Sequence, residues 1–382
     1  MGSIRRIFIY FCTFATNSIT NSRNMFAEKR YPEKLDADEL DEYLSKGWYR
    51  MGQSIFTTHF LCFGHTFFSA LWIRLPLDKH ASSKRHRKLM RRNSRLEISY
   101  SPFNHQQPDK EQENLYQRYR KQFPGLLAPS LRDALYDGDE KNIFNTWQCI
   151  IKDGGKLVAL SYFDLGQQSI ASIMGIYDPA YKNDSLGFYT MLMEIEFGRS
   201  NGFQYYYPGY IVPGYPRFDY KMRIGKVESY LLRNDDWAPF PSQVKSEDVP
   251  MLKMDRHLQE MCHYLNLNHS PCVKKYYPLF EANLFGFWHA PYLDYPVLLV
   301  CSQLENPHTF LITVFDPRQE EYHLMRCSIF DDLQFYFNPT FTESFNPKDH
   351  FLELLIIDEM IEKSKKPQDI LLALRYVTDS TR

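Results

Sequence analysis

The alternation of apolar and polar residues divides the N-terminal part of the chain into segments with helical and strand-like periods. A helix is predicted from the N-cap residue Asp36 to a stop at Gly47. Its apolar face carries Leu40 and Leu44, which are four residues apart and therefore one turn apart. Residues 54–77 alternate aromatic, small and polar positions, a pattern typical of two strands.

A longer alternation of strand-like and helical periods follows. Strands are predicted at 96–100, 143–151, 156–165, 169–178, 203–207 and 226–233, and helices at 111–122, 129–136 and 186–200. Up to residue 207 the order is β-α-α-β-β-β-α-β, which resembles the order of the acetyltransferase-type (GNAT) fold. The resemblance implies a GNAT-like core, although a fold alone does not define a function.

Beyond Pro239 the pattern changes to that of a separate, smaller α+β region. A helix is predicted at 251–267, strands at 295–303, 309–315 and 321–328, and an amphipathic helix at 349–363. The predicted fold class is therefore α+β, with a GNAT-like core between a smaller N-terminal domain and an extra C-terminal region. The expected boundaries are an extension at 1–24, an N-terminal domain at 25–105, the core at 106–240 and the additional region at 241–382.

The first 24 residues are interpreted separately. Residues 7–15 are apolar and follow Arg5 and Arg6, as in a signal peptide, but no convincing cleavage site follows them. The alternative is that translation begins at Met25 and that residues 1–24 are a non-native or disordered extension. No run approaches the roughly 18 apolar residues of a membrane span, so no membrane association is predicted.

Composition narrows the class of protein. The chain of 382 residues is 44% hydrophobic and carries a net charge of −1, which indicates a globular protein and neither favours nor excludes an anionic partner. Seven scattered cysteines indicate reduced thiols in a cytoplasmic protein. The charge is uneven, however, because residues 79–95 contain eight Lys or Arg, two His and no acid.

Several chemistries lack their sequence motifs. The phosphate-binding loop, the dinucleotide fingerprint, the zincin motif and the serine-hydrolase elbow are all absent. The segment 199–204 only partly matches a CoA pyrophosphate turn and lies at the wrong end of the helix 186–200, which disfavours CoA. Ser185 and Gly187 open that helix, so its free N–H groups can face an anion or a developing oxyanion, or Ser185 is an ordinary N-cap.

Short runs in a fixed order carry a family resemblance. They are Gly47–Gly52, Arg92–Asn93, Leu115–Tyr119, Tyr177–Pro179, Ser185–Gly187, Tyr207–Tyr210 and Tyr220–Lys221. Together they resemble the aminoacyl-tRNA–protein transferases, the arginyl-transferases and their bacterial aspartate/glutamate leucyltransferase relatives. The resemblance covers roughly residues 40–240. It implies transfer of an amino acid from charged tRNA to a protein N-terminus, without a cofactor.

The chain also departs from the family pattern. Only Cys62 remains of the N-terminal Cys cluster, and the sets His59, Cys62, His65 and Cys262, His263, His269, Cys272 match no recognised metal spacing. No metal is therefore predicted. Tyr49, Gln122–Phe123, Ala171 and Pro208 replace residues that the family favours. These substitutions leave open an altered specificity or an inactive enzyme.

The resemblance gives the basic segment a candidate role in binding the tRNA acceptor stem, and the alternative is a solvated positive helix. The cations concerned are Lys84, Arg85, Arg87, Lys88, Arg91, Arg92 and Arg95. Aminolysis of an activated ester needs orientation, oxyanion stabilisation and at most a modest base, which fits a chain without a nucleophile triad.

Further site residues follow from position, each against the alternative of ordinary packing or surface exposure. Asp164, at a strand end, is expected to hold the incoming ammonium or to relay its proton. Tyr220 and Lys221 are expected to bind the terminal adenosine phosphate or the acidic side chain of the acceptor. Tyr207 and Tyr210 are expected to wall the aminoacyl pocket. Arg50 is expected to meet a carboxylate or a tRNA phosphate, since its planar fork suits both.

The preferred hypothesis is an arginyl-type transferase that acts on proteins with acidic N-termini in the N-degron pathway, with arginyl- or leucyl-tRNA as donor. The first alternative is a non-catalytic tRNA- or protein-binding derivative, suggested by the substituted positions. An acyl-CoA N-acyltransferase ranks last, because the pyrophosphate turn is missing.

Overall fold

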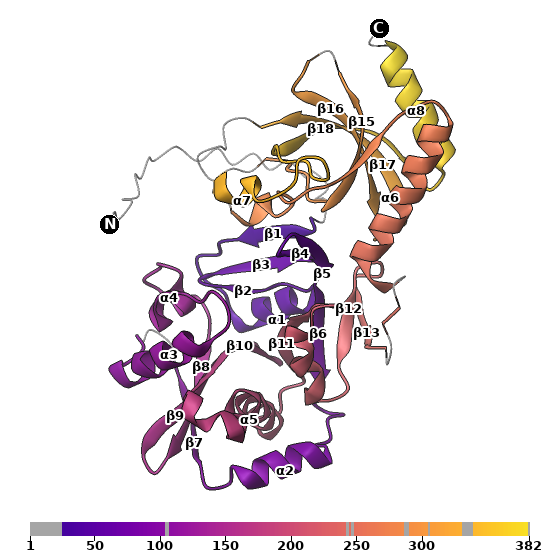
Figure 1. Ribbon diagram of the computed structural model, residues 1–382. Coiled ribbons are helices and arrows are strands. Elements are labelled where there is room, and N and C mark those ends of the chain that lie inside the picture. The colour runs from indigo at the N-terminus through magenta and orange to yellow at the C-terminus, as the bar shows by residue number, and fades with distance from the viewer. Residues whose placement is uncertain are drawn as a thin grey trace.

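The computed structural model describes residues 25–103, 107–241, 244–245, 248–285, 290–304, 306–330 and 339–380. The predicted extension at 1–24 lies outside these residues. Figure 1 shows two lobes along the long axis of the molecule, with the N-terminal strands between the large sheet and the C-terminal lobe. Within the described part of the chain, no helix combines the length and apolarity that crossing a bilayer requires.

The N-terminal domain packs one helix against short strands. Its elements are β1 (Ala27–Arg30), α1 (Ala37–Ser45), β2 (Tyr49–Met51), β3 (Ser54–Thr58), β4 (Phe60–Phe63) and β5 (Thr66–Ser69). Strands β1, β3 and β2 form one small sheet, and β4 and β5 form a hairpin. Asp36 precedes α1 as predicted, and its N–H donates to the Glu39 carboxylate at 2.8 Å, which satisfies one backbone donor at the helix start.

An eight-stranded sheet forms the centre of the lower lobe, in the order β13-β12-β6-β11-β10-β9-β8-β7. The strands are β6 (Leu71–Pro76), β7 (Glu97–Pro102), β8 (Thr146–Asp153), β9 (Lys156–Leu165), β10 (Ser169–Tyr177), β11 (Tyr205–Ile211), β12 (Glu228–Leu231) and β13 (Asp236–Pro239). The predicted element order from residue 96 to 207 is confirmed. Strands β6 and β7, which precede the boundary predicted between residues 105 and 106, belong to the same sheet as β8 to β11.

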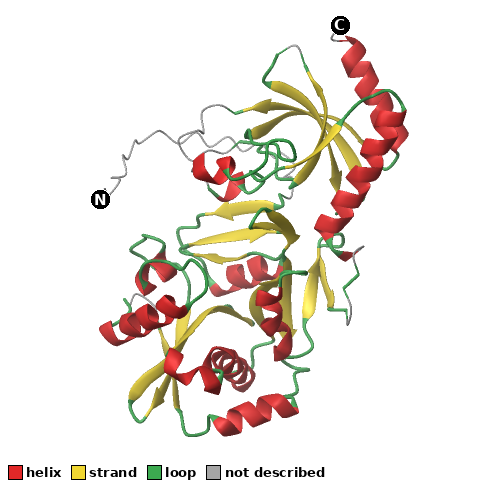
Figure 2. Cartoon of the chain, viewed as in Figure 1, coloured by secondary structure: helices red, strands yellow, loops and turns green. Residues whose placement is uncertain are grey.

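Helices cover both faces of the sheet (Figure 2). They are α2 (Lys84–Arg92), α3 (Lys110–Gln122), α4 (Leu131–Tyr136), the short 3₁₀ helix η1 (Pro179–Asp184), α5 (Leu186–Ser200) and the 3₁₀ helix η2 (Pro216–Ile224). Helix α5 packs on β9 and β10, and Leu192 and Ile195 enter a core with Phe163 and Tyr206. Helix α3 covers the opposite face, where Leu115 packs among the side chains around α4.

The strands β10 and β11 pair in parallel over only three residues and then separate. Ser169–Ala171 pair with Tyr205–Tyr207, and over their described residues these two strands do not pair with each other any further. The register of β10 shifts between Ser172 and Met174, and that of β11 between Tyr206 and Gly209. Bulges of this kind bend a strand and re-aim its side chains. The Tyr49 hydroxyl lies where the strands part, bonded to the carbonyls of Ser172 and Tyr207.

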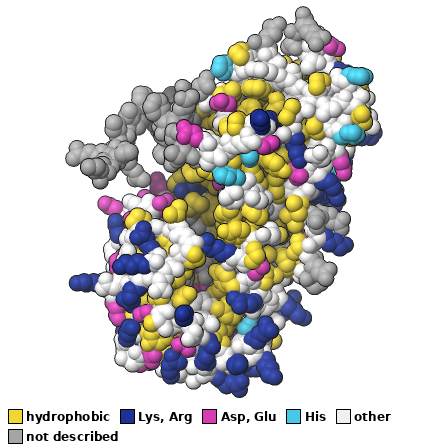
Figure 3. Space-filling view, in the orientation of Figure 1, with side chains coloured by type: hydrophobic (Ala, Val, Ile, Leu, Met, Phe, Trp, Pro, Cys, Tyr) yellow, Lys and Arg dark blue, Asp and Glu magenta, His cyan; other side chains and the backbone are white. Residues whose placement is uncertain are grey.

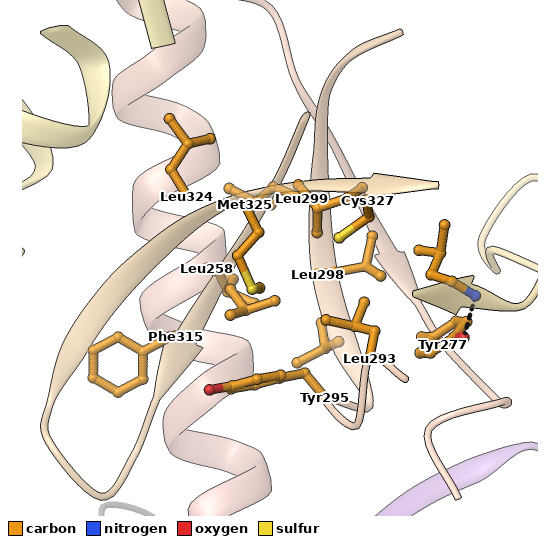
Figure 4. Packing of buried hydrophobic residues seen from close by; sticks show 14 of the residues in the cluster. Leu258, Tyr277, Leu293, Tyr295, Leu298, Leu299, Phe315, Leu324, Met325 and Cys327 are labelled. Carbon is orange, nitrogen blue, oxygen red and sulfur yellow. Dashed lines mark hydrogen bonds between the residues drawn. The ribbon is translucent and has the colours of Figure 1, made fainter. Parts of the chain in front are cut away.

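The C-terminal region folds as a five-stranded antiparallel sheet with two long helices. Its elements are α6 (Pro250–Leu267), β14 (Val273–Tyr276), η4 (Ala282–Leu284), β15 (Val297–Gln303), β16 (Thr309–Asp316), β17 (Glu321–Ile329), α7 (Pro339–Glu343), β18 (Leu355–Ser364) and α8 (Pro367–Ser380). Figure 4 shows Leu258 of α6 beside Met325 of β17, within the core that this sheet buries.

Two predictions of elements are wrong. Residues 54–77 were expected to form two strands and form four shorter ones, β3 to β6. The segment 349–363 was expected to be an amphipathic helix, but Leu355–Ser364 is strand β18, which pairs antiparallel with β17. Its isoleucines at 356, 357 and 361 are β-branched and suit a pleated surface. The pairing with β17 supplies backbone hydrogen bonds that the side-chain spacing alone does not reveal.

The C-terminal and N-terminal domains share a core. Phe26 and Phe60, from the N-terminal domain, are 0% and 1% exposed and belong to the same apolar cluster as Phe280 and Tyr295. The N–H of Met251, at the start of α6, donates to the Ser69 hydroxyl at 2.8 Å. Continuous burial of this kind makes the two domains one packed body.

Candidate active site

Lys221 lies in η2 beside the end of β11, where that strand has left β10. Its ammonium donates to the Tyr210 carbonyl at 3.0 Å and lies 5.4 Å from the ring centroids of both Tyr210 and Phe218. We refer to Tyr210, Phe218 and Lys221 together as the Lys221 site. Burial among aromatic rings lowers the pKa of Lys221 to about 8, because the charged form loses hydration. The site therefore holds a cation that titrates near physiological pH.

Gly209 makes this arrangement possible. A Cβ at residue 209 would lie 3.2 Å from the Lys221 ammonium, and the backbone φ of +89° is one that side chains of L-residues rarely adopt. Tyr220, next to Lys221, is 39% exposed, and its pKa is raised by partial burial and by the carboxylate of Glu194. Both members of the predicted Tyr220–Lys221 pair therefore lie near the end of β11.

Tyr207 lies apart from Tyr210. Its ring packs against Trp237 at 5.5 Å, and its hydroxyl accepts a long hydrogen bond from Arg74 at 3.5 Å. Tyr210 instead meets Trp72 edge to face at 5.1 Å. The two tyrosines that were predicted to wall one pocket therefore have different ring neighbours.

The N-terminus of α5 lies at the other end of η2. Ser185 precedes the helix in the left-handed conformation and makes no side-chain capping bond, so the predicted cap is absent. Its hydroxyl instead accepts from Arg92 at 3.3 Å. A Cβ at Gly187 would lie 3.1 Å from the Tyr177 ring, so glycine lets that ring approach the helix start. The N–H groups of Phe188 and Tyr189 donate to the Ser185 carbonyl, so Leu186 and Gly187 carry the remaining first-turn N–H groups at the positive end of the helix dipole.

Runs that are distant in the sequence meet around this helix start. Arg92 contacts Ser185, and the Asn93 amide donates to the Asp184 carbonyl at 3.0 Å. Arg118 pairs with Asp178 at 3.2 Å. The Tyr119 and Tyr177 rings lie 5.3 Å apart edge to face, and with Lys182 they line a small pocket of about 110 Å³. Four of the sequence runs that carry the family resemblance thus converge at one place.

The basic segment forms helix α2 beside that place. The His86 ring bonds to the Arg223 carbonyl of η2 at 2.7 Å, which fixes α2 against the segment that also carries Lys221. Figure 3 shows Lys and Arg side chains gathered at the end of the molecule where α2 lies. Seven cations predicted to bind tRNA are exposed there, namely Lys84, Arg85, Arg87, Lys88, Arg91, Arg92 and Arg95.

Arg50 and Asp164 are buried together on the opposite face of the sheet. Their side chains are 3% and 0% exposed and form an ion pair at 2.9 Å. Thr146 donates to the same carboxylate oxygen at 2.6 Å, and Arg50 also donates to the Leu135 carbonyl at 2.7 Å. Burial raises the pKa of Asp164, and Arg50 and Thr146 oppose that shift. The structure does not bring either residue to the Lys221 site.

Two carboxyls that the sequence reasoning missed are those of Glu194, which is buried, and Glu281, which is half-buried. Glu194 of α5 is 1% exposed and accepts from the Tyr206 hydroxyl at 2.8 Å, and burial raises its pKa to about 7. The signal was an acid directly between the apolar residues Met193 and Ile195. Glu281 lies in the C-terminal domain, outside the region of family resemblance, so no sequence signal singled it out.

A cavity of about 720 Å³ lies elsewhere, between the N-terminal and C-terminal domains. Its lining includes Glu42, Tyr43, Trp48 and Tyr230. None of the predicted site residues lines it. Arg30 beside Glu28 and Lys46 beside Glu42 are already paired within it, at 2.7 and 2.6 Å.

Comparisons with known proteins point to the same family as the sequence runs that meet at the start of α5. Residues 85–230 match the family described as arginine-tRNA-protein transferase, C terminus. An aspartate/glutamate leucyltransferase of Leptospira interrogans is 29% identical over 196 residues, which is 50% of this chain and 74% of that protein. The enzyme of the same description from Acinetobacter baumannii is 24% identical over 248 residues, or 63% and 85% of the two chains.

The solved structures that resemble the chain do so weakly. L-PGS from Bacillus licheniformis has a TM-score of 0.28 at 15% identity, over 46% of this chain and 51% of that one. A GCN5-related glucosamine N-acetyltransferase region of a fungal protein has a TM-score of 0.29 at 11% identity, over 55% of this chain and 24% of that one.

The matching family and its relatives are transferases, and the matched segment contains α2, α5, β11 and Lys221. The protein is therefore a transferase by class. More closely, residues 85–230 match the arginine-tRNA-protein transferase family, and the similarity to the aspartate/glutamate leucyltransferases places this part of the chain among the aminoacyl-tRNA–protein transferases.

Proposed function

We propose that the protein transfers an amino acid from charged tRNA to the N-terminal α-amine of proteins that begin with an acidic residue, and so marks them for N-degron proteolysis. In this proposal the large sheet is a GNAT-like core, and the aminoacyl end of the tRNA binds where β10 and β11 diverge. The observation that carries the proposal is the convergence of the family runs on the start of α5, with Lys221 held nearby by η2.

The charge distribution supports a path for the tRNA. The exposed cations of α2 can follow the acceptor-stem phosphates, a contact that depends on salt rather than on sequence. At one end of this path, beside the start of α5, Arg92 donates to the Ser185 hydroxyl and Arg95 donates to the Asp184 carboxylate. The loaded 3′ end is thereby directed to the place where η2, α2 and α5 meet.

The reaction requires little more than placement and charge stabilisation. The acceptor amine attacks the ester carbonyl carbon, a tetrahedral oxyanion forms, and its collapse breaks the bond to the ribose oxygen. The proton lost by the amine leaves with that ribose hydroxyl. Because an α-amine titrates near pH ~8, a modest base or a water relay is sufficient. The ester is already activated, so no covalent enzyme intermediate is needed.

Roles can be assigned to the residues that lie together. The N–H groups at Leu186 and Gly187 begin α5 and can stabilise the oxyanion, with Ser185 and Arg92 beside them. Lys221 and Tyr220 can bind the acidic side chain of the acceptor or the adenosine phosphate. We assign no substrate contact to Arg50 or Asp164, because both side chains are buried and form an ion pair with each other.

The test is transfer from labelled arginyl-tRNA and leucyl-tRNA to peptides that begin with Asp or Glu. Transfer from at least one donor is expected, and Lys221→Ala should reduce it roughly 10- to 100-fold, the value of one hydrogen bond to a charged group. Lys226→Ala is the matched control, because Lys226 is an exposed lysine just beyond η2. Its transfer rate should equal that of the wild type.

A second function has one specific observation in its favour. Arg50 and Asp164, two expected site residues, are unavailable to substrate, as they would be in a non-catalytic tRNA-binding derivative. Absence of transfer from both donors, together with tRNA binding that requires α2, would reject the enzyme and support this derivative.

A further inference from the structure

Two cysteines of the C-terminal domain bring their sulfur atoms together. Cys262 lies in the last turns of α6, and Cys272 directly precedes β14. Their Sγ atoms are 3.3 Å apart, whereas the sulfur atoms of a disulfide are about 2.05 Å apart. The two sulfurs therefore need to approach by only about 1.3 Å to form a bond.

The side chain of Asn266 holds the two cysteines in this arrangement. Its Oδ1 accepts from the Cys272 N–H at 3.0 Å, and its Nδ2 donates to the Cys262 Sγ at 3.4 Å. Asn266 lies one turn after Cys262 on α6, so one face of the helix makes both contacts. The Cys262 thiol also donates to the Cys272 carbonyl at 3.5 Å. These bonds fix both backbones and keep the sulfurs facing each other.

The two thiols differ in exposure, which gives them different roles toward a small oxidant. Cys262 is half-buried, whereas Cys272 is only 7% exposed. A reagent from solvent therefore reaches Cys262 first. Cys272 lies against it as a second thiol, where it can attack a modified Cys262 sulfur.

A third thiol lies on the far side of Cys272. Val273 pairs with Val300 across β14 and β15, so Cys272 and Cys301 are opposite each other one position further along the antiparallel strands. Cys301 is 9% exposed, and its Sγ lies 3.3 Å from the Thr313 hydroxyl. Among the residues that the structure describes, no three His, Cys, Asp or Glu side chains are placed to hold a metal ion. The arrangement therefore favours a bond between two sulfurs.

We propose that Cys262 and Cys272 form an oxidative modification site, at which a peroxide oxidises Cys262 and Cys272 then closes a disulfide. The Cys262 thiolate attacks one peroxide oxygen, the O–O bond breaks, hydroxide leaves, and Cys262 becomes a sulfenic acid. The Cys272 thiolate attacks that sulfur and displaces a second hydroxide. Two thiols and hydrogen peroxide thus give one disulfide and two waters, and two electrons pass from sulfur to oxygen.

The disulfide would close a short loop, residues 263–271, at the surface of the C-terminal domain. Helix α8 rests on this loop, because Arg375 donates to the Asn268 carbonyl at 2.6 Å. Oxidation should therefore slow the amide hydrogen exchange of residues 263–271, and reduction by dithiothreitol should restore it. The loop lies outside residues 85–230, so the inference does not depend on the proposed transfer reaction.

The test treats the full chain with hydrogen peroxide, alkylates the remaining thiols and maps the peptides by mass spectrometry. A Cys262–Cys272 disulfide is expected. Cys62, the other half-buried cysteine in the described part of the chain, is the internal reference. Burial raises the pKa of Cys262 to about 11 and that of Cys62 to about 12. Cys262 therefore carries more thiolate and should oxidise roughly three- to tenfold faster.

Serine variants separate the two steps. In Cys272→Ser the sulfenic acid on Cys262 should persist and be captured by dimedone. In Cys262→Ser no disulfide should form, and Cys62→Ser, the matched control, should form it at the wild-type rate. A Cys272–Cys301 disulfide in wild type, or a Cys262 that stays unbridged and oxidises no faster than Cys62, overturns the inference. Because wild type alone reports these results, a variant that does not fold leaves the test intact.

Discussion

At the scale of single residues, Glu194 shows how burial changes a carboxyl group. Its side chain is 1% exposed beneath the sheet, and only one of its oxygens accepts a hydrogen bond from a described residue. The pKa is raised from the ordinary 4.5 to about 7, chiefly by desolvation. Glu194 is therefore largely protonated in the folded protein at mildly acidic pH, whereas in the unfolded chain it is ionised.

The raised pKa of Glu194 predicts a pH-dependent loss of stability. An acid with a higher pKa in the folded state is neutral in both states below pH 4.5, and its contribution is lost as the pH rises from 4.5 to 7. Glu194→Gln removes this effect. Its free energy of unfolding, relative to that of wild type, should be roughly 2 to 3 kcal/mol larger at pH 8 than at pH 5, which means that the variant is relatively more stable at pH 8. Urea unfolding of both proteins at the two pH values measures this, and an equal difference at both would contradict the prediction.

The pair of Arg50 and Asp164 marks the limit of sequence reasoning at this scale. Arg50 lies within a family run and Asp164 lies at a predicted strand end, and both suit a substrate contact. They are 114 residues apart, and only the fold reveals that each is the other's partner in a buried pair. Nothing in the local pattern distinguishes a carboxylate that faces substrate from one that faces an arginine of another domain.

At the scale of elements, the periodicity of apolar residues predicted helices and strands correctly where pairing with a distant strand did not change the outcome. The helix at α5 and the strands β8 to β10 have strong periods and short turns, and they form close to the predicted limits. The segment of β18 has apolar residues at both helical and alternating spacings, so partners decide its state. Antiparallel pairing with β17 makes this segment a strand, and the sequence of the segment itself does not reveal that pairing.

Helix α2 predicts a salt-dependent contact with tRNA. The variant Lys88→Gln with Arg91→Gln removes two exposed charges and leaves His86, which anchors the helix, in place. Affinity for tRNA should fall, and the slope of log affinity against log salt should decrease by roughly 0.7 to 0.9 for each phosphate that the variant no longer neutralises. Binding titrations at several salt concentrations measure both quantities.

The control for α2 is Lys365→Gln with Lys366→Gln. These two lysines are exposed in the C-terminal domain between β18 and α8, so the net charge changes equally. If both double variants weaken tRNA binding to the same extent, general charge rather than α2 governs the contact, and the proposed path is wrong.

At the scale of the whole molecule, the two lobes are expected to unfold together. Phe60 belongs to the N-terminal domain in sequence and to the core of the C-terminal domain in space. Phe60→Ala should therefore lower the stability of the full chain by roughly 3 to 5 kcal/mol. Calorimetry of wild type should show a single transition, which the variant shifts to lower temperature. Two separate transitions, of which only one moves, would contradict a shared core.

The position of β6 has a consequence for the order in which the chain acquires its structure. Residues 71–76 leave the ribosome well before β11 and β12, yet they form hydrogen bonds with both. More than 120 residues must be synthesised before either strand is available, so the contact is strongly non-local and slow to close. During synthesis β6 presents unsatisfied edges, and the nascent chain is most prone to aggregation in this interval.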